Sequence, residues 1–106
     1  MNQIPAQSLA YSYTIVNNSD EPIQVKVQFR KLDRAKDLYY FVQAGEKKTK
    51  SHTGFYVGAC AKTVRIHYVE SNVSKCGKYN TLCGNKTIKV TNDTVNGVVK
   101  LHNCTF

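Results

Sequence analysis

Four cysteines, Cys60, Cys76, Cys83 and Cys104, are the residues of this 106-residue chain with the clearest capacity for chemistry. An even number of cysteines in a small, strand-rich chain is typical of a domain held by disulfides in an oxidising compartment. Of the three possible pairings we favour Cys76 with Cys83, which closes a short loop, and Cys60 with Cys104, which ties an internal strand to the C-terminal segment. Each disulfide would stabilise the fold by about 2 to 4 kcal/mol.

Other uses of the cysteines fit the spacing less well. A structural zinc site usually places two of its ligands within about two to four residues of each other, whereas Cys76 and Cys83 have six residues between them. A thioredoxin-like redox pair needs Cys-x-x-Cys at the start of a helix, and the sequence meets neither condition. Free buried thiols are the remaining alternative. We therefore predict structural disulfides, with no metal and no cofactor.

Histidine is the next candidate for chemistry, as a general base. His52, His67 and His102 are the three histidines, and no Gly-x-Ser-x-Gly, His-Glu-x-x-His or glycine-rich phosphate loop accompanies them. The acidic residues sit in or beside predicted turns, without the spacing of a glycosidase pair. We therefore predict that the chain is not an enzyme and assign no catalytic residue. The alternative is a small secreted enzyme, nuclease-like, that uses His67 or His102.

Basic side chains outnumber acidic ones. The chain has 15 Lys and Arg against 7 Asp and Glu, a formal net charge of +8 and a sequence pI of about 9.4, so its surface should attract anions. If the polar sides of the strands align, they form one broad positive patch. Its anion-binding candidates are Lys26, Arg30, Lys47, Lys48, Lys50, Arg65, His67, Lys89 and Lys100, with His102 beside them. The alternative is an ordinary solvated sheet face.

Aromatic residues come in two runs, which contain Tyr39, Tyr40, Phe41, Phe55 and Tyr56. Because side chains alternate between the faces of a strand, each run must place a ring on both faces. An outward ring beside lysines could stack on bases or sugars, or contact a protein partner. The alternative is that these rings cover the other sheet or a loop.

Asn-x-Ser/Thr triplets are frequent in the chain and are headed by Asn17, Asn72, Asn85, Asn92 and Asn103. They permit N-glycosylation in a eukaryotic secretory pathway. Asn is also common in turns and Thr in strands, so junctions between the two produce such triplets without glycosylation. We favour this second interpretation.

The segments that must position these residues have the alternation of β-strands. Residues 23–30, IQVKVQFR, alternate apolar and polar side chains, which predicts a strand with one face in the core and one in water. Residues 11–17, YSYTIVN, alternate in the same way and precede the turn-rich NNSDEP. The other predicted strands are residues 38–43, 47–51, 55–60 and 63–69. Short runs around residues 88–90 and 99–101 flank Asn96-Gly97, which predicts a hairpin turn at that dipeptide.

No helical pattern of ten residues occurs in the sequence. Seven or eight short strands separated by turns predict an all-β, antiparallel sandwich, with a small closed barrel as the alternative. We expect one domain over residues 1–106, in which residues 1–10 form a flexible N-terminal segment.

Two stretches resemble the immunoglobulin-like sandwich modules that are common in extracytoplasmic proteins. TIVNNSDEPIQVKVQF, residues 14–29, is similar to an opening strand, a turn and a second strand, and VQAGEKKTK, residues 42–50, to the turn into a later strand. The resemblance extends over most of the chain in the rhythm of its strands. The chain has no Trp and no Cys in the second strand, so it lacks the antibody-type Cys-Trp-Cys core. The resemblance implies a scaffold and no particular activity.

The sequence contains no run near the roughly 20 apolar residues of a membrane span, and MNQIPAQSLA lacks the basic start and apolar run of a signal peptide. If the cysteines are paired, we expect a signal peptide to have been removed before residue 1. The prediction is a secreted or periplasmic binding module with a basic surface, whose partner is a protein or an anionic polymer such as a glycan, a lipid headgroup surface or nucleic acid. An intracellular nucleic-acid-binding barrel with reduced cysteines is a further alternative.

Overall fold

Every regular element in the described part of the chain is a β-strand. The computed structural model describes residues 10–29, 36–53, 61–82, 85–96 and 101–105. The strands are β1 (Ala10–Asn17), β2 (Ile23–Phe29), β3 (Leu38–Val42), β4 (Lys47–Thr53), β5 (Ala61–Tyr68), β6 (Val73–Leu82), β7 (Lys86–Val90), β8 (Val95–Asn96) and β9 (His102–Asn103). No helix among the described residues is long and apolar enough to cross a membrane.

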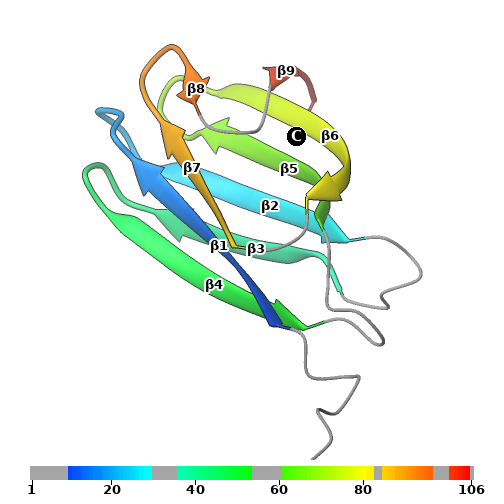
Figure 1. Cartoon of the computed structure of the whole chain (residues 1–106). Helices are drawn as coiled ribbons and strands as arrows, with labels where there is room; N and C mark the ends of the chain where they lie inside the picture. Colours follow the sequence, from blue (N-terminus) through cyan, green and yellow to red (C-terminus); the bar gives the residue numbers. More distant parts are fainter. Residues whose placement is uncertain (1–9, 30–35, 54–60, 83–84, 97–100, 106) are drawn as a thin grey trace, which may run out of the picture.

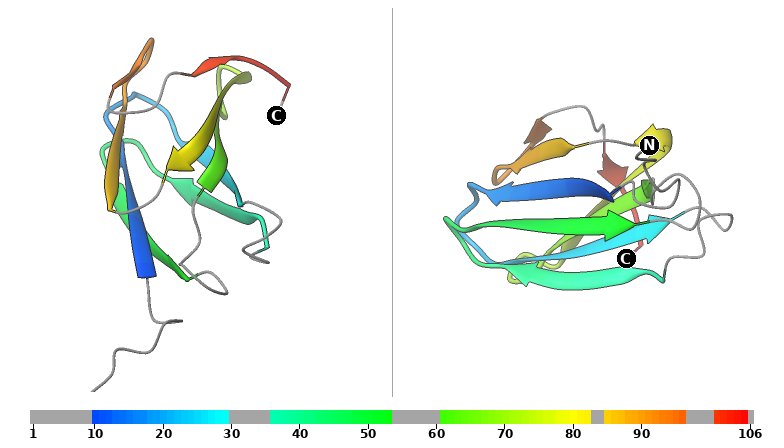
Figure 2. Two further views of the ribbon diagram at one scale, coloured as in Figure 1. Left: turned by 45° about the vertical axis from the view of Figure 1, so that its right-hand side comes forward. Right: turned by 60° about the horizontal axis from the view of Figure 1, so that its bottom comes forward.

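The strands form two sheets (Figure 1). Sheet A has four strands in the order β4-β1-β7-β8, and sheet B has five in the order β3-β2-β5-β6-β9. Neighbouring strands are antiparallel, except that β1 and β7 run parallel. Figure 2 shows the sheets as two facing layers that do not close on themselves. The predicted all-β sandwich is therefore confirmed, and the closed-barrel alternative is wrong.

Strand β2 shows why the sequence builds this core. Its side chains alternate between buried and half-buried from Ile23 to Phe29, so the apolar positions face sheet A. Antiparallel β5 does the same in register, with Val25 opposite Ile66. Burying each such aliphatic side chain stabilises the fold by about 1.5 to 3 kcal/mol. The buried core consists of Tyr13, Ile15, Ile23, Val25, Val27, Phe29, Tyr40, Val42, Val64, Ile66, Tyr68, Ile88 and Val90.

A buried polar residue, Asn17, joins the two sheets at one end of the sandwich. Its side chain is 0% exposed, and its Nδ2 donates to the carbonyls of Glu21, at 2.8 Å, and Val42, at 3.0 Å. Its Oδ1 accepts from the backbone N and the Oγ of Ser19, at 3.0 and 2.5 Å. The backbone of Asn17 also bonds to the turn before β4, where Gly45 has a φ of 78° that favours glycine. One amide therefore ties the end of β1 to the end of β3.

Strand β6 was not among the predicted strands. It pairs with the free edge of β5 over most of its length, with Arg65 opposite Cys76 and His67 opposite Ser74. Its sequence, VSKCGKYNTL, lacks a repeating apolar position, because this strand covers the margin of the core. The strand conformation of β6 therefore comes from its pairing with β5 rather than from an apolar face of its own.

The predicted hairpin turn at Asn96-Gly97 is misplaced. Strands β7 and β8 form the hairpin, with Lys89 opposite Asn96, so Asn96 lies within a strand. The turn lies at residues 91–94, where the amide of Thr91 donates to the carbonyl of Thr94 and the amide of Thr94 donates to Oγ1 of Thr91. The threonine side chain closes this turn without an Asn-Gly pair. The predicted strand at residues 55–60 lies outside the described residues, as do residues 1–9 of the expected N-terminal segment, and Ala10 begins β1.

Candidate anion-binding face

The outward side of sheet B brings three of the predicted basic residues together. Lys26 of β2 and Arg65 of β5 are direct partners in the antiparallel register, and Gln24 is the partner of His67. The Cβ atoms of such partners lie about 4.5 to 5.5 Å apart, and like charges in this arrangement repel. We call Lys26, Arg65 and His67 the cationic face. An anion placed between Lys26 and Arg65 would relieve their repulsion.

Two aromatic rings border the cationic face on the edge strand β3. Tyr39 is the register partner of Lys26, and Phe41 is the partner of Gln24. Their side chains are 54% and 49% exposed, respectively. The Nζ of Lys26 lies 5.3 Å from the centre of the Tyr39 ring, within the range of a cation–π contact. The rings therefore offer apolar contact area beside positive charge.

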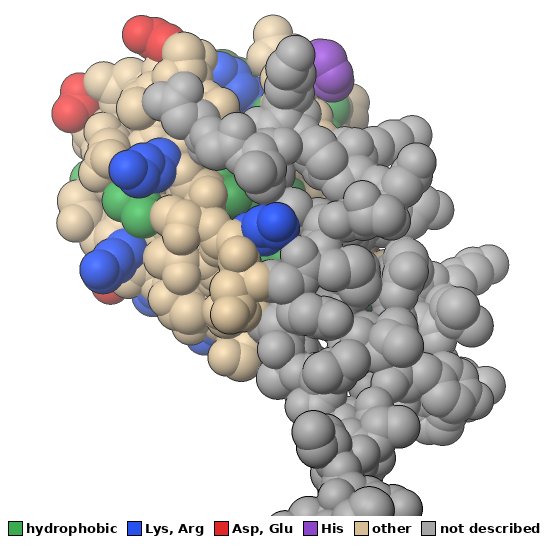
Figure 3. Space-filling model, viewed as in Figure 1, with side chains coloured by type: hydrophobic (Ala, Val, Ile, Leu, Met, Phe, Trp, Pro, Cys, Tyr) green, Lys and Arg blue, Asp and Glu red, His purple; other side chains and the backbone are tan. Residues whose placement is uncertain are grey.

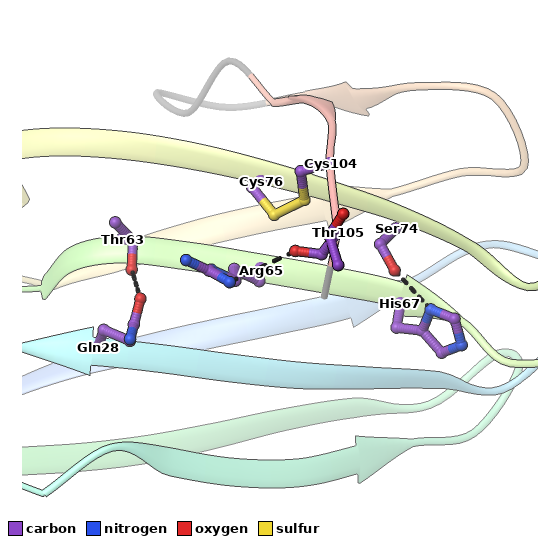
Figure 4. The surroundings of a disulfide bond; sticks show 8 residues. All are labelled: Gln28, Thr63, Arg65, His67, Ser74, Cys76, Cys104 and Thr105. Carbon is purple, nitrogen blue, oxygen red and sulfur yellow. Dashed lines mark hydrogen bonds between the residues drawn. A yellow bond between two sulfur atoms is a disulfide. The ribbon is translucent and has the colours of Figure 1, made fainter.

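Hydrogen bonds between side chains of neighbouring strands order this face (Figure 4). Oγ1 of Thr63 donates to Oε1 of Gln28 at 2.6 Å, and Nδ1 of His67 and Oγ of Ser74 share a hydrogen bond of 2.6 Å. The first contact joins β5 to β2 and the second joins β5 to β6. The cationic face thus stands on three paired strands rather than on loops.

A disulfide on the same side of sheet B joins Cys76 of β6 to Cys104, with a Cα–Cα distance of 5.8 Å (Figure 4). The favoured pairings of Cys76 with Cys83 and of Cys60 with Cys104 are therefore wrong. The reason is topological: β9 pairs with β6 and places Cys104 next to Cys76, a neighbour that spacing along the chain does not reveal. Cys60 and Cys83 lie outside the described residues.

The remaining basic candidates do not join the cationic face. Lys47 and Lys89 are both register partners of Val16, so they lie on the outward side of sheet A. Figure 3 shows that side, where the basic side chains of the described residues are scattered and do not form one patch. The single broad patch that the sequence predicted is therefore divided between the two sheets. Arg30 and Lys100 lie outside the described residues.

Lys48 and Lys50 of the edge strand β4 lie on the inward face of sheet A, where Lys48 is half-buried and Lys50 is exposed. They are the register partners of the buried Ile15 and Tyr13, respectively. The Nζ of Lys48 donates to the carbonyl of Phe41 at 2.6 Å, and the Nζ of Lys50 lies 5.5 Å from the centre of the Tyr40 ring. Both lysines therefore bridge from sheet A to β3. Inward lysines on an edge strand discourage pairing with another chain.

Catalytic chemistry is a second use to weigh for this face. A histidine and a serine in contact could supply a base and a nucleophile, but acyl transfer also needs an orienting group and donors for an oxyanion. His67 and Ser74 are register partners, so strand pairing alone accounts for their contact, which assigns no catalytic role. Among the described residues, no three or more His, Cys, Asp or Glu side chains gather in a way that could hold a metal ion.

Two adjoining hollows, of about 330 and 300 Å³, lie where the sheets part beside β6 and the turn at residues 91–94. Lys75 and Asp93 line both. The Nζ of Lys75 donates to the carbonyl of Asp93 at 2.6 Å and lies 5.7 Å from the centre of the Tyr68 ring. Burial, together with the nearby carboxylates of Glu21 and Asp93, raises the pKa of Tyr68 to about 12. The hydrogen bond of Lys75 thus links the turn at residues 91–94 to sheet B. His102 also lines the larger hollow.

Three of the asparagines that head Asn-x-Ser/Thr triplets have structural roles. Asn17 is the buried residue whose side chain joins the two sheets. Oδ1 of Asn85 accepts from the backbone N and the Oγ of Ser12, at 3.0 and 2.9 Å. Asn92 exchanges two hydrogen bonds with Asp20, of 2.7 and 2.8 Å. These contacts support the interpretation that turns and strand junctions produce the triplets. The other two, headed by Asn72 and Asn103, start at exposed residues.

Sequence reasoning missed Ser74 and Thr105 as parts of this face. Ser74 belongs to the unpredicted strand β6 and bonds to His67. Nη1 of Arg65 donates to the carbonyl of Thr105 at 3.4 Å, a backbone contact that depends on the path of the C-terminal segment. No signal in the sequence could have revealed either contact, since both depend on pairing between distant strands.

The comparisons with known proteins show the fold alone. No known family matches the chain, and no curated protein does. Among solved structures, the chain is similar to a protein from Eubacterium rectale determined by NMR, with a TM-score of 0.57 over 98% of this chain and 97% of that one. The two are 11% identical. This similarity supports the all-β sandwich over nearly the whole length of both chains.

Proposed function

We propose that this protein is a disulfide-linked binding module that holds an anionic polymer on the cationic face of sheet B. The observation that carries the proposal is the placement of Lys26 and Arg65 as register partners beside the exposed rings of Tyr39 and Phe41. An anionic polymer whose acidic groups alternate with sugar units or aromatic rings could use both parts of this surface. Its acidic groups would contact Lys26 and Arg65, and its rings would pack on Tyr39 and Phe41.

Charge favours a polyanion over a neutral partner. The net charge of +8 attracts anions over the whole surface, and the cationic face concentrates this attraction at paired strands. Among the described acidic residues, Asp37 accepts a hydrogen bond from Gln28 at 3.4 Å toward one end of β2. Glu21 precedes β2 at its other end and interacts electrostatically with His67. The centre of the face is therefore positive.

The disulfide supports a secreted or periplasmic location, because such bonds persist in oxidising compartments and are rare in the cytosol. The immunoglobulin-like resemblance fits the same proposal, since such modules commonly serve as extracytoplasmic binding scaffolds. In this proposal the sandwich provides a rigid support and the side chains of one sheet provide the contacts.

The test compares two variants that lose the same charge. Lys26→Gln/Arg65→Gln removes two cations from sheet B, and the matched control Lys47→Gln/Lys89→Gln removes two from the outward side of sheet A. Binding to a heparin oligosaccharide and to a single-stranded oligonucleotide is measured by fluorescence anisotropy over a range of salt concentrations. We expect the first variant to bind about tenfold more weakly and with a salt dependence reduced by roughly one to two ions. The control should lose about twofold through net charge alone.

Equal losses in the two variants would refute the assignment to sheet B. A wild-type chain that binds neither probe at low salt would refute a polymer partner and leave the exposed rings as the contact surface for a protein, where Tyr and Phe are enriched.

A further inference from the structure

The last described residues cross the outward side of sheet B, over β6 and toward β5 (Figure 4). We call residues 102–105 the C-terminal strap. Its strand β9 pairs with β6 through Lys75 opposite Asn103 and Cys76 opposite His102. The amide of Cys104 donates to the carbonyl of Ser74 at 3.0 Å. The strap then leads to Thr105, whose carbonyl accepts from Arg65. The strap therefore covers part of the cationic face.

The strap is weakly held except by its disulfide. Its ladder with β6 contains two residue pairs, and a two-residue ladder by itself is marginal in water. The side chains of His102, Asn103 and Thr105 are exposed, whereas Leu101, just before the strap, is partly buried against the core. The Cys76–Cys104 bond is thus the main tether beyond Leu101.

We propose that the Cys76–Cys104 disulfide is a redox latch, which keeps the C-terminal strap over Arg65 and limits access of the anionic polymer to the cationic face. This inference rests on the proposed function. The reductant is an external dithiol. One of its thiolates attacks Sγ of Cys104 and displaces the Cys76 thiolate; the second thiolate then resolves the mixed disulfide. The products are two cysteine thiols and one oxidised dithiol, a transfer of two electrons and two protons.

Opening the latch releases the strap from residue 102 onward and frees Arg65 from its contact with the Thr105 carbonyl. The guanidinium can then offer its donors to an acidic group, and a guanidinium bonds more strongly to an anion than to a neutral carbonyl. Lys26 lies directly opposite Arg65, so an anion that enters from the side of the strap can contact both cations. Affinity for an anionic polymer should therefore rise on reduction.

The experiment measures two quantities on the full chain, oxidised and reduced by a dithiol. Heparin-oligosaccharide affinity reports on the face, and hydrogen exchange at the amide of Cys104 reports on the strap. We expect reduction, and the variant Cys76→Ser/Cys104→Ser, to raise affinity about fivefold and to abolish protection at residue 104. Protection in β2 and β5 should persist and shows that the sandwich stays folded. The matched control Cys60→Ser/Cys83→Ser should keep the oxidised affinity and the protection.

The variant Arg65→Gln separates the latch from general loosening, because reduction should no longer change its affinity. If protection at residue 104 is lost while affinity stays the same, the latch is refuted and the proposed function stands. If protection at residue 104 survives reduction, the disulfide is not the tether and the latch is likewise refuted. If no state of the chain binds the probe, the proposed function fails together with the latch.

Discussion

Replacing Asn17 with Ala should destabilise the sandwich far more than its size suggests. The substitution removes both donors and the acceptor of a side chain that is 0% exposed. The carbonyl of Val42 and the amide of Ser19 then lose their partners in a buried environment. Glu21 keeps a bond, because Oγ of Ser19 lies 2.9 Å from its carbonyl oxygen and can donate its hydroxyl hydrogen there once Asn17 is replaced. Two orphaned groups at about 1 to 3 kcal/mol each give a loss of roughly 2 to 6 kcal/mol.

Such a loss is a large part of the total of about 5 to 15 kcal/mol that is typical of a domain. The assay is urea unfolding followed by tyrosine fluorescence, since the chain has seven Tyr and no Trp. With a slope of about 1 to 3 kcal/mol per molar urea, the midpoint should fall by at least about 0.7 M. The neighbouring Asn18 is exposed and provides the matched control, because Asn18→Ala should change stability by no more than about 0.5 kcal/mol.

A second variant, Asn17→Asp, distinguishes hydrogen bonding from packing. It has the same shape but replaces the amide donor with a carboxylate oxygen that faces the carbonyls of Glu21 and Val42. We expect it to be at least as destabilised as Asn17→Ala at neutral pH, since one oxygen of a buried carboxylate would face two carbonyl oxygens, and burying such a charge is costly. If Asn17→Ala behaved like Asn18→Ala, or if Asn17→Asp matched the wild type, the hydrogen-bond argument would be refuted.

Two further predictions concern covalent structure and pH. Ala61 and Leu82 are register partners, and Cys60 and Cys83 are the next residues beyond them in the sequence, so we expect Cys60 to pair with Cys83. A peptide map without reduction should show this link, and a free thiol at either position would contradict it. The pKa of Tyr68 is about 12 in the fold and about 10 in an unfolded chain, so the unfolded state loses its proton first. Stability should fall from pH 10 to 12, less steeply in Tyr68→Phe, and equal slopes in the two proteins would exclude this cause.

The fold could be predicted wherever a strand has one face in the core. In β2 and β5 the alternation of Val25 and Ile66 with polar residues is sufficient, because burial of one face imposes a period of two. Strand β6 lies at the margin, where the inward positions include Lys75 and Gly77. Its strand conformation comes from pairing with β5, a long-range contact that no local pattern contains.

The candidate site was predictable in part for the same reason. Alternation shows that Lys26 and Arg65 point away from the core, but not that their strands are neighbours. Lys89 has the same outward position in β7, yet β7 pairs with β1 and carries it to the opposite sheet. Local sequence predicts which side chains of one strand point outward. Which strands become neighbours, and so which outward side chains share a surface, depends on the sheet topology.

The edge strands indicate how a partner could be bound. Lys48 and Lys50, on the inward face of β4, protect the β4 edge from pairing with another strand. The ammonium of Lys48 also donates a hydrogen bond to the carbonyl of Phe41 on the edge strand β3. Addition of a partner strand at this side would have to displace both lysines. The rings of Tyr39 and Phe41 point to the other side of β3 and are about half exposed. A partner can therefore bind through the side chains on the outward face of sheet B. Pairing of a partner strand with the backbone of the β4 and β3 edges is opposed by Lys48 and Lys50, which also contribute to the positive charge of the chain.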